Sequence, residues 1–316
     1  MHRRDLLALA LLPCARSAPA ADFPAREVRL VVPSGTGSSS DALGRELAPI
    51  LQRRWRSPVN VENVGGTMPQ LATQRVLREP ADGHTIQVTN TSSFTTAALV
   101  RTLPFDMLAD LRGVAGLAVL PLYLVVRTSA AWNSLESLLQ ASRRAPRRYV
   151  YGSAGPRSGT HIAMALLADL AQVQWLHAAF PGSQEAAAEL VAGRLHLAML
   201  PRGVALKAVA TGKARIVAVT EPVPWPEASG LPVLSANYVE YGFRGIFGAA
   251  VRTATPPAAV DTLHTALRQA IVELDGSGRL AELGFIPATS SPAEFQRVMR
   301  EQVTLWGIWS RRLPLD

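Results

Sequence analysis

Small and hydroxyl-bearing residues fill the stretch from Ser34 to Asp41, which reads S-G-T-G-S-S-S-D. An apolar run at Val28–Val32 precedes it, and a helix-like pattern begins at Asp41. A strand that passes through such a loop into a helix presents unpaired backbone N–H groups and the positive end of the helix dipole to one point. This arrangement favours an anion, which neutral donors would hold because the stretch has no Lys or Arg. The candidate ligand contacts are Ser34, Thr36, Gly37, Ser38, Ser39 and Asp41.

The same stretch also fits a plain connection between a strand and a helix, with one serine as the N-cap. Neither G-x-x-x-x-G-K-[ST] nor G-x-G-x-x-G is present, so the stretch is not a phosphate-binding loop of those types. Taken alone, it leaves the anion site and the plain connection equally open. For Asp41, the position at a helix start favours a role in stabilising the first turn over contact with an ammonium group on a ligand.

The pattern of strand, glycine- and hydroxyl-rich loop and helix recurs along the chain. The further loops are expected at residues 63–67, 89–93 and 152–160, after strands near 59–62, 85–89 and 149–151. Strands that alternate with helices along the chain predict parallel sheets. When each strand is followed by a similar glycine- and hydroxyl-rich loop, a ligand crevice is expected at the carboxyl ends of the strands. The recurrence therefore favours the binding interpretation of the first loop.

Residues 1–21 have the composition of an export signal. Arg3 and Arg4 precede a short apolar run, and Ala18-Pro-Ala20 fits a cleavage site. The apolar run is too short to span a membrane. The R-R-D-L-L sequence also resembles a twin-arginine signal. We expect residues 1–21 to be removed and the protein to function in the periplasm.

Composition excludes several classes of function. Cys14 is the only cysteine, so the exported chain would have no disulfide or thiol chemistry. The net charge of the whole chain is +8, and removing the three arginines and one aspartate of the signal leaves +6. The arginine clusters at 53–56 and 143–148 sit at expected helix ends, so they indicate solvated ends rather than a nucleic-acid surface. The histidines are dispersed without a metal-binding motif, and no metal or cofactor is expected.

The later chain predicts a second α/β unit and a return to the first. Apolar, extended segments near Val119–Val126 and Phe243–Ala250 fit two crossings between the units. We predict residues 22–121 plus 248–316 as a first lobe and residues 122–247 as a second. A capping box at Ser291–Glu294 starts the last helix, whose tryptophan stripe indicates core. Two such lobes form a hinged clamshell that closes around a ligand.

Many short motifs resemble the tripartite tricarboxylate transporter solute receptors, also called Bug receptors. The resemblance runs in order from about Phe23 to the C-terminus. Each motif is loose, but a dozen in register are specific. They include V-R-L-V-V-P, S-S-D, Val61-Glu-Asn63 with Gly65-Gly66, Pro80-Ala-Asp-Gly83, Leu103-Pro-Phe-Asp106, Tyr151-Gly-Ser-Ala-Gly155 with Thr160-His161, Gly182-Ser183, Gly193-Arg-Leu195, Thr211-Gly-Lys-Ala, Ala218-Val-Thr220, Gly248-Ala and Leu305-Trp306.

This resemblance implies a two-lobed α/β periplasmic binding protein of the type II, or Venus-flytrap, class with two hinge crossovers. It implies a monomer that binds a small carboxylate between its lobes and works with membrane permease components, without catalysis. By match, the binding loops in addition to Ser34–Asp41 contain Gly65, Gly66, Thr67, Thr91, Ser92, Ser93, Ser153, Arg157, Ser158, Gly159, Thr160, Phe180, Pro181, Gly182 and Ser183.

The chain departs from the family mainly in these loops. Pro33-Ser-Gly-Thr-Gly-Ser stands where P-F-x-A-G-G is usual, and Pro156-Arg157-Ser158 stands where Asn-Gly-Thr is frequent. Arg157 therefore either grips a carboxylate or is a solvated loop charge. His161 is expected to be packed or capping. Two alternative functions remain: a sensor that signals to a membrane kinase, and a hydrolase that uses Ser153 or Ser39, which would need a base nearby.

Overall fold

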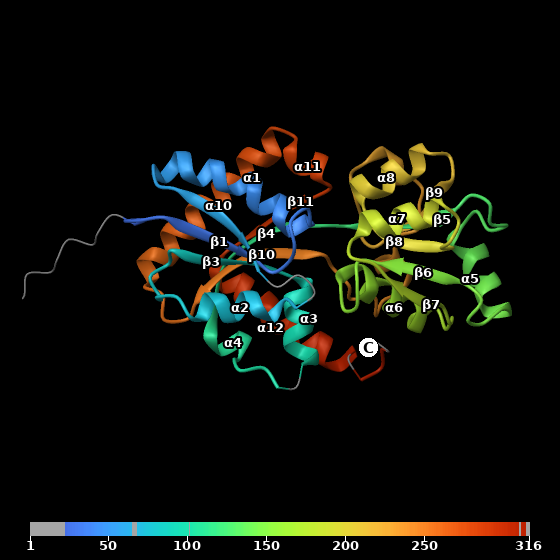
Figure 1. Ribbon diagram of the computed structural model, residues 1–316, viewed down its shortest axis with the longest axis horizontal. Coiled ribbons are helices and arrows are strands. Elements are labelled where there is room, and N and C mark those ends of the chain that lie inside the picture. Colours follow the sequence, from blue (N-terminus) through green and yellow to red (C-terminus); the bar gives the residue numbers. More distant parts are fainter. Residues whose placement is uncertain (1–22, 65–67, 101, 310, 314–316) are drawn as a thin grey trace, which may run out of the picture.

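Two β-sheets, each with helices on both faces, make up the protein (Figure 1). The computed structural model describes residues 23–64, 68–100, 102–309 and 311–313, so the predicted signal at 1–21 lies outside the described residues. The first sheet has six strands in the order β11-β4-β10-β3-β1-β2, and the second has five in the order β7-β6-β8-β5-β9. We call each sheet with its helices a lobe.

The first lobe takes its strands from both ends of the chain. They are β1 (Val28–Val32), β2 (Val59–Asn63), β3 (Thr85–Asn90), β4 (Leu111–Val119), β10 (Ile246–Arg252) and β11 (Ile286–Ser290). Its helices are α1 (Ser39–Trp55), α10 (Pro257–Gly276) and α11 (Arg279–Leu283) on one face, and α2 (Gln70–Leu77), α3 (Thr91–Leu99), α4 (Met107–Asp110) and α12 (Pro292–Trp309) on the other.

Strand β1 shows why the sheet forms as it does. Three of its five residues are valines, which suit a pleated surface. Leu30, Val31 and Val32 are fully buried, as expected for an interior strand with helices on both faces. β1 pairs in parallel with β2 and with β3. The loops that follow these three strands therefore lie at the same edge of the sheet.

The second lobe is built from the middle of the chain. Its strands are β5 (Leu122–Arg127), β6 (Val150–Ser153), β7 (Leu176–Ala179), β8 (Leu197–Pro201) and β9 (Ala214–Val219). Its helices are α5 (Leu135–Arg144), α6 (Gly159–Leu170), α7 (Ser183–Val191), α8 (Arg202–Ala210), the 3₁₀ turn η1 (Pro226–Ala228) and α9 (Leu234–Asn237). Strands β6 to β9 run parallel to one another, and β5 runs against them. None of the helices in the described chain is long and apolar enough to cross a membrane.

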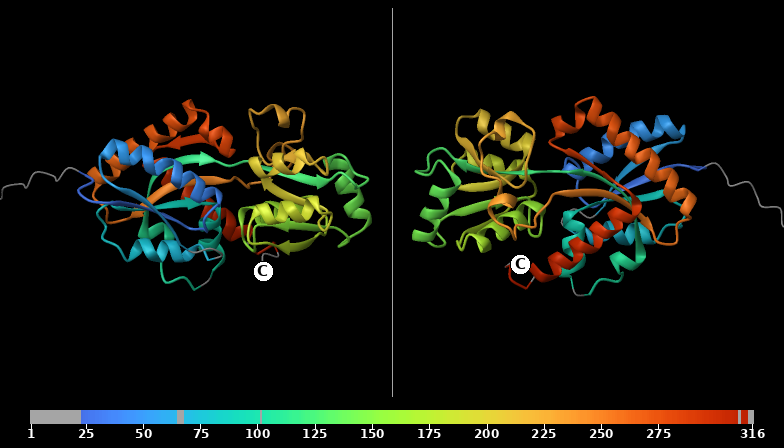
Figure 2. Two further views of the ribbon diagram at one scale, coloured as in Figure 1. Left: turned by 45° about the horizontal axis from the view of Figure 1, so that its top comes forward. Right: turned by 180° about the vertical axis from the view of Figure 1, so that it is seen from behind.

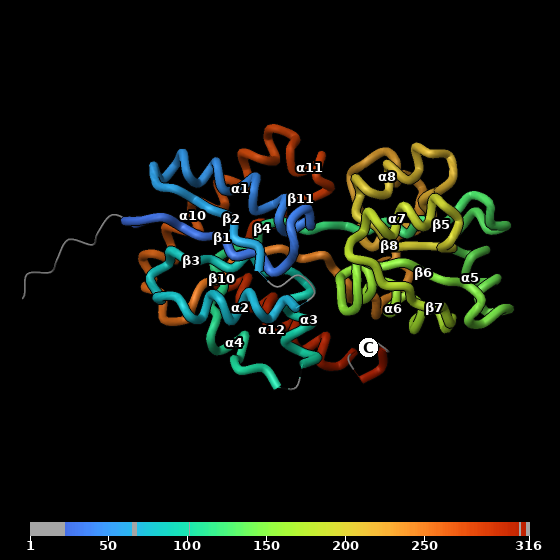
Figure 3. Tube along the Cα trace, viewed as in Figure 1, coloured from blue at the N-terminus to red at the C-terminus, as the bar shows by residue number. Residues whose placement is uncertain are grey.

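The chain passes between the sheets twice, between β4 and β5 and again just before β10 (Figure 3). The two connections touch, because the N–H of Leu120 donates to the carbonyl of Gly245 at 2.7 Å. A Cβ at residue 245 would lie 2.2 Å from the Leu120 carbonyl oxygen, so only glycine fits there. The type II, two-lobed architecture with two crossovers is confirmed.

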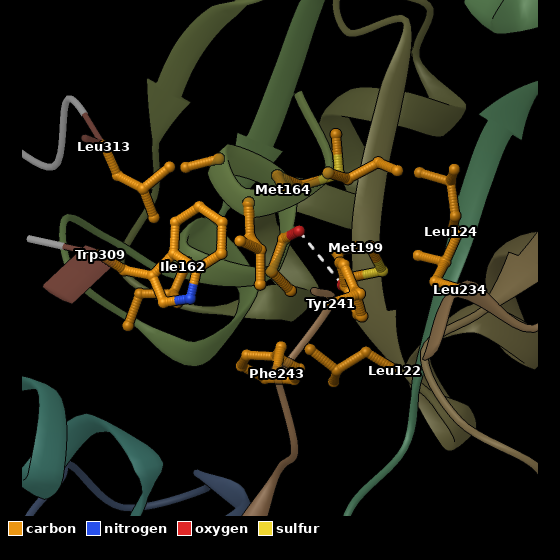
Figure 4. Packing of buried hydrophobic residues seen from close by; sticks show 14 of the residues in the cluster. Leu122, Leu124, Ile162, Met164, Met199, Leu234, Tyr241, Phe243, Trp309 and Leu313 are labelled. Carbon is orange, nitrogen blue, oxygen red and sulfur yellow. Dashed lines mark hydrogen bonds between the residues drawn. The ribbon is translucent and has the colours of Figure 1, made fainter. Parts of the chain in front are cut away.

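Helix α12 adds an apolar contact between the lobes. Its end and the following turn place Trp309 and Leu313 against Ile162 of α6 (Figure 4). Phe243, on the second connection, belongs to the same buried cluster, and Tyr241 donates from its hydroxyl to the carbonyl of Ala163 at 3.2 Å. The cores of the two lobes are therefore continuous on this side.

Arg202 makes a polar contact between the lobes at α8 and α11. Its Nη1 donates to the carbonyl of Ala281 in α11 at 2.8 Å, and its Nε pairs with Glu227. The guanidinium also lies 4.5 Å from the centre of the Trp225 ring. Figure 2 shows the lobes from two further sides, with α12 and the two connections joining them.

Gly248 offers a test of the packing between β10 and α12. A Cβ at this position would lie 1.9 Å from Cζ of Phe295. We expect Gly248→Ala to lower the free energy of unfolding by about 1–3 kcal/mol through overpacking, measured by denaturant titration. Gly276→Ala is the control, because no atom lies within 4 Å of its added Cβ. Equal stability of Gly248→Ala and the wild type would contradict the packing described.

Candidate functional site

Four helix N-termini lie where the two lobes face each other: those of α1 and α3 in the first lobe, and of α6 and α7 in the second (Figure 1). Each helix follows the carboxyl end of a parallel strand. The strand register supports this placement. Asn90, at the end of β3, pairs with Phe247, which follows one connection, and Pro201, at the end of β8, pairs with Leu122, which follows the other. The predicted loops before these four helices are thus brought to facing edges of the two sheets.

The loop before α1 is held by its own hydroxyls and by Asp41. Ser38 is the N-cap and accepts from the N–H of Asp41 at 3.2 Å, while the Ser34 and Ser38 hydroxyl oxygens lie 2.6 Å apart. Asp41 is buried and accepts from the N–H of Gly37 at 2.8 Å and from Arg45 Nε at 3.0 Å. Burial alone would raise the pKa of Asp41, but the hydrogen bonds from Arg45 and Gly37 hold it below its usual value.

These contacts divide the residues predicted in this loop into two groups. Ser34, Ser38, Gly37 and Asp41 bond to one another and shape the loop. Thr36 is exposed and Ser39, in the first turn of α1, is half-buried. Arg45 also reaches Asn63, which in turn donates from its side chain to the carbonyl of Ser34. The following loop residues Gly65, Gly66 and Thr67 lie outside the described residues.

The predicted loop at Thr91–Ser93 is instead the first turn of helix α3. The reason is its N-cap, Asn90, whose side chain accepts from the N–H of Ser93 at 3.0 Å. Thr91 is buried, and its hydroxyl donates to the carbonyl of Arg244 and accepts from the N–H of Ile246. This hydroxyl therefore ties α3 to the second connection between the lobes. Ser92 is half-buried in the same turn.

The loop before α6 repeats this construction in the second lobe. Ser158 is the N-cap and accepts from the N–H of His161 at 3.3 Å. Thr160 accepts from the N–H of Ala154 at 2.9 Å, and Gly159 packs near the ring of Phe243. Arg157 has a left-handed backbone (φ 59°) and is exposed. Its N–H donates to Nδ1 of His161 at 3.0 Å, which fixes the unusual conformation.

Two histidines that are 16 residues apart in the sequence stack beneath this loop. The ring centres of His161 and His177 lie 3.9 Å apart at an interplanar angle of 15°. The Tyr151 ring also stacks against His177, at 4.9 Å, and its centre lies 6.1 Å from that of His161. Burial, then the neighbouring His177 and Arg157, lower the pKa of His161 to about 3. Burial also lowers the pKa of His177. Both rings are therefore neutral at physiological pH, and Nδ1 of His161 is an acceptor.

Ser153 lies at the edge of this stack. Its hydroxyl is 2.7 Å from Nε2 of His177 and 3.1 Å from the carbonyl oxygen of Gly155. A base does stand within reach of this serine, as a hydrolase would need. However, Ser153 is only 1% exposed, and burial lowers the pKa of His177, whereas the carboxylate partner of a catalytic histidine would raise it.

The fifth predicted loop precedes α7. The N–H of Phe180 donates to the carbonyl of Ser153 at 3.0 Å, which links the two second-lobe loops. Gly182 is the N-cap and provides no side-chain acceptor for the first-turn N–H groups. Pro181 is exposed, and Ser183, the first residue of the helix, is half-buried. No group of three or more His, Cys, Asp or Glu side chains able to hold a metal occurs among the described residues.

Most of the sequence matches a family model. Residues 43–313 match the model described as "Tripartite tricarboxylate transporter family receptor". The chain belongs to this family. It therefore has the fold of a periplasmic solute-binding receptor, and the receptors of this family are periplasmic.

Individual relatives agree with the family assignment. A protein of the UPF0065 group from Pseudomonas sp. (strain P51) is 27% identical over 90% of this chain and 85% of its own. BugT of Bordetella pertussis is 23% identical over 90% of this chain and 88% of its own. Among solved structures, an R. palustris protein determined with adipate is 27% identical, covers 92% of this chain and 98% of its own, and has a TM-score of 0.78.

Acid titration tests the neutral histidine stack. The pKa of His161 is about 3 in the folded protein and about 6.5 in an unfolded chain, so the unfolded state takes up the proton first as the pH falls. The free energy of unfolding should therefore be largest above pH 6.5 and decrease toward pH 3, by up to about 1.4 kcal/mol per pH unit. His161→Asn should flatten this slope, measured by denaturant titration across the pH range.

Met164→Leu, in the same helix, is the control for this test. It changes packing without changing a titrating group, so it should shift the stability curve and leave its slope intact. Identical pH slopes for His161→Asn and the wild type would show that the histidine does not titrate as described.

Proposed function

We propose that the protein is a periplasmic receptor that binds a small organic carboxylate between its lobes and delivers it to a tripartite tricarboxylate-type membrane transporter. The observation that carries this proposal is the set of four helix N-termini, on α1, α3, α6 and α7, at the facing edges of the two lobes. Helix N-termini offer backbone N–H groups and positive dipole ends to an anion. The adipate-bound relative supports a carboxylate as the ligand class.

The predicted site residues take two roles in this proposal. Ser34, Ser38, Asp41, Thr91 and Ser153 use their side chains to hold loops and helix caps in place. The ligand contacts come from the first-turn N–H groups and from side chains exposed or half-buried at the facing edges. We assign these contacts to Thr36, Ser39, Ser92, Arg157, Ser158, Gly159, Thr160, Phe180, Pro181, Gly182 and Ser183. Gly37 instead donates its N–H to Asp41, and Gly65, Gly66 and Thr67, which lie outside the described residues, stay predicted contacts.

The proposal includes the organisation of the chain. Residues 1–21 are a signal peptide, residues 22–121 plus 248–316 form the first lobe, and residues 122–247 form the second. The receptor acts as a monomer, because one chain supplies both facing edges. Closure of the lobes excludes water from the ligand and strengthens each hydrogen bond to it.

Calorimetry against mono-, di- and tricarboxylates tests the proposed function. We expect at least one acid to bind with a dissociation constant on the order of micromolar or tighter. A panel without any binding, on protein freed of ligand by partial unfolding and refolding, would contradict the proposal.

Arg157 allows a sharper test of the same site. A charge-assisted hydrogen bond to a carboxylate contributes about 1.5–3 kcal/mol, so Arg157→Gln should weaken binding roughly 10- to 100-fold. Arg147→Gln is the matched control, because Arg147 has nearly the same left-handed backbone (φ 58°) on a different loop. Equal affinity of the two variants would exclude Arg157 from the site.

A serine hydrolase is the second candidate, because Ser153 lies 2.7 Å from His177. The burial of Ser153 and its second contact to Gly155 weigh against this candidate. We expect neither turnover of p-nitrophenyl esters above the level of Ser153→Ala nor labelling by a fluorophosphonate probe. Stoichiometric labelling of Ser153 would reverse this conclusion.

A further inference from the structure

The second lobe has an edge that faces away from the first lobe. Strands β6, β7, β8 and β9 are parallel and begin at this edge, and the antiparallel β5 ends there. Helix α5 also ends beside it, at the far end of the molecule from the first lobe in Figure 1. The edge is therefore as distant from the proposed carboxylate site as the second lobe allows.

Nearly every segment that ends or begins at this edge contains an arginine or a lysine there. Arg127 ends β5, Arg215 lies at the start of β9, and the others lie in the turns that precede strands or at the end of α5. We call these residues the distal edge: Arg127, Arg144, Arg147, Arg148, Arg194, Lys213 and Arg215. Arg127 and Arg215 are half-buried, and the other five are exposed.

Two cations of the distal edge act on the same histidine, His196. Arg127 and Arg148 come from different segments, yet both, after burial itself, lower the pKa of His196. Nδ1 of His196 accepts from the N–H of Val150 at 3.1 Å, so this neutral ring lies within the field of both cations. Cations gathered around one ring repel each other, and a bound anion would compensate that repulsion.

Acidic partners are scarce at this edge compared with the first lobe. Within the described chain, Arg194 pairs with Glu189, whereas no ion pair involves Arg144, Arg148 or Lys213. In the first lobe, by contrast, arginines of several elements pair with glutamates of other elements: Arg53 with Glu273, Arg75 with Glu62 and Arg279 with Glu46. The unpaired positive charge of the lobe is therefore concentrated at the distal edge.

One apolar side chain lies among these cations. Leu176 begins β7 and is 38% exposed, and the N–H of Leu176 donates to the carbonyl of Tyr149 next to Arg148. Beside it, Trp175 donates from Nε1 to the hydroxyl of Ser142 at 2.8 Å. Cations spread along a sheet edge, with an exposed leucine on the outermost strand beside them, suit a broad anionic surface with an apolar interior better than a small anion in a pocket.

We propose that the distal edge binds the anionic headgroups of a phospholipid membrane. This surface is separate from the carboxylate site and is a property of the second lobe. Contact at this edge would hold the receptor at the membrane while its facing helix N-termini remain free to exchange ligand. The attraction would be electrostatic, so it should weaken as ionic strength rises.

Flotation with lipid vesicles tests this proposal on the full exported chain. We expect the protein to float with vesicles that contain phosphatidylglycerol and not with vesicles of phosphatidylcholine alone. The triple variant Arg144→Gln, Arg148→Gln and Lys213→Gln should bind the anionic vesicles on the order of 100-fold more weakly, from the contribution of each cation near an anionic surface. Unchanged thermal unfolding would show that the variant is folded.

The matched control removes three positive charges from the first lobe: Arg53→Gln, Arg54→Gln and Arg56→Gln. It should lose no more than a few-fold in vesicle binding. Equal losses in both variants would show an effect of net charge alone and overturn the proposal, as would the absence of any preference for anionic vesicles. Displacement by inorganic phosphate beyond that by chloride at equal ionic strength would indicate a phosphate pocket instead. These outcomes are independent of carboxylate binding, which calorimetry measures separately.

Discussion

The contact between the two connections is the constraint on which the arrangement of the lobes depends. Leu120 and Gly245 approach so closely that residue 245 has no space for a side chain. Thr91 fixes the same junction from the first lobe, because its hydroxyl bonds to the backbone on both sides of Gly245. The loops before α1, α3 and α6 all lie at strand ends near this junction. Their mutual position therefore follows from the fit of a few backbone atoms.

The facing edges combine neutral donors with rigid supports. Several hydroxyls in the predicted loops already bond to helix caps or to neighbouring backbone, so in the proposed site they would orient backbone N–H groups rather than contact the ligand. Buried Asp41 and the neutral pair His161 and His177 serve the same end beneath the two loops. Preorganised dipoles stabilise an anion without the desolvation cost of burying an opposite charge. The proposed site would thus depend on many weak, fixed donors.

The sequence was sufficient for the parts of the fold that local patterns determine. Apolar strands followed by glycine- and hydroxyl-rich loops indicated parallel sheets, and the Ser291–Glu294 capping box was found as predicted. The partners of Thr91 could not be predicted, because they lie more than 150 residues away. The stack of His161 and His177 was missed for a related reason. It requires the register in which Tyr151 pairs with His177, and one sequence does not reveal that register.

The contacts that flank the two connections have a thermodynamic consequence. Arg202 joins the lobes at α11, and Trp309 with Leu313 joins them at α6. Two rigid bodies joined at such separate places have few relative motions left. The lobes therefore lose most of the entropy of their relative rotation and translation when the chain folds, and lose little more when a molecule bridges them. Closure around the proposed ligand would then resemble an intramolecular step, with a high effective concentration of one binding face for the other.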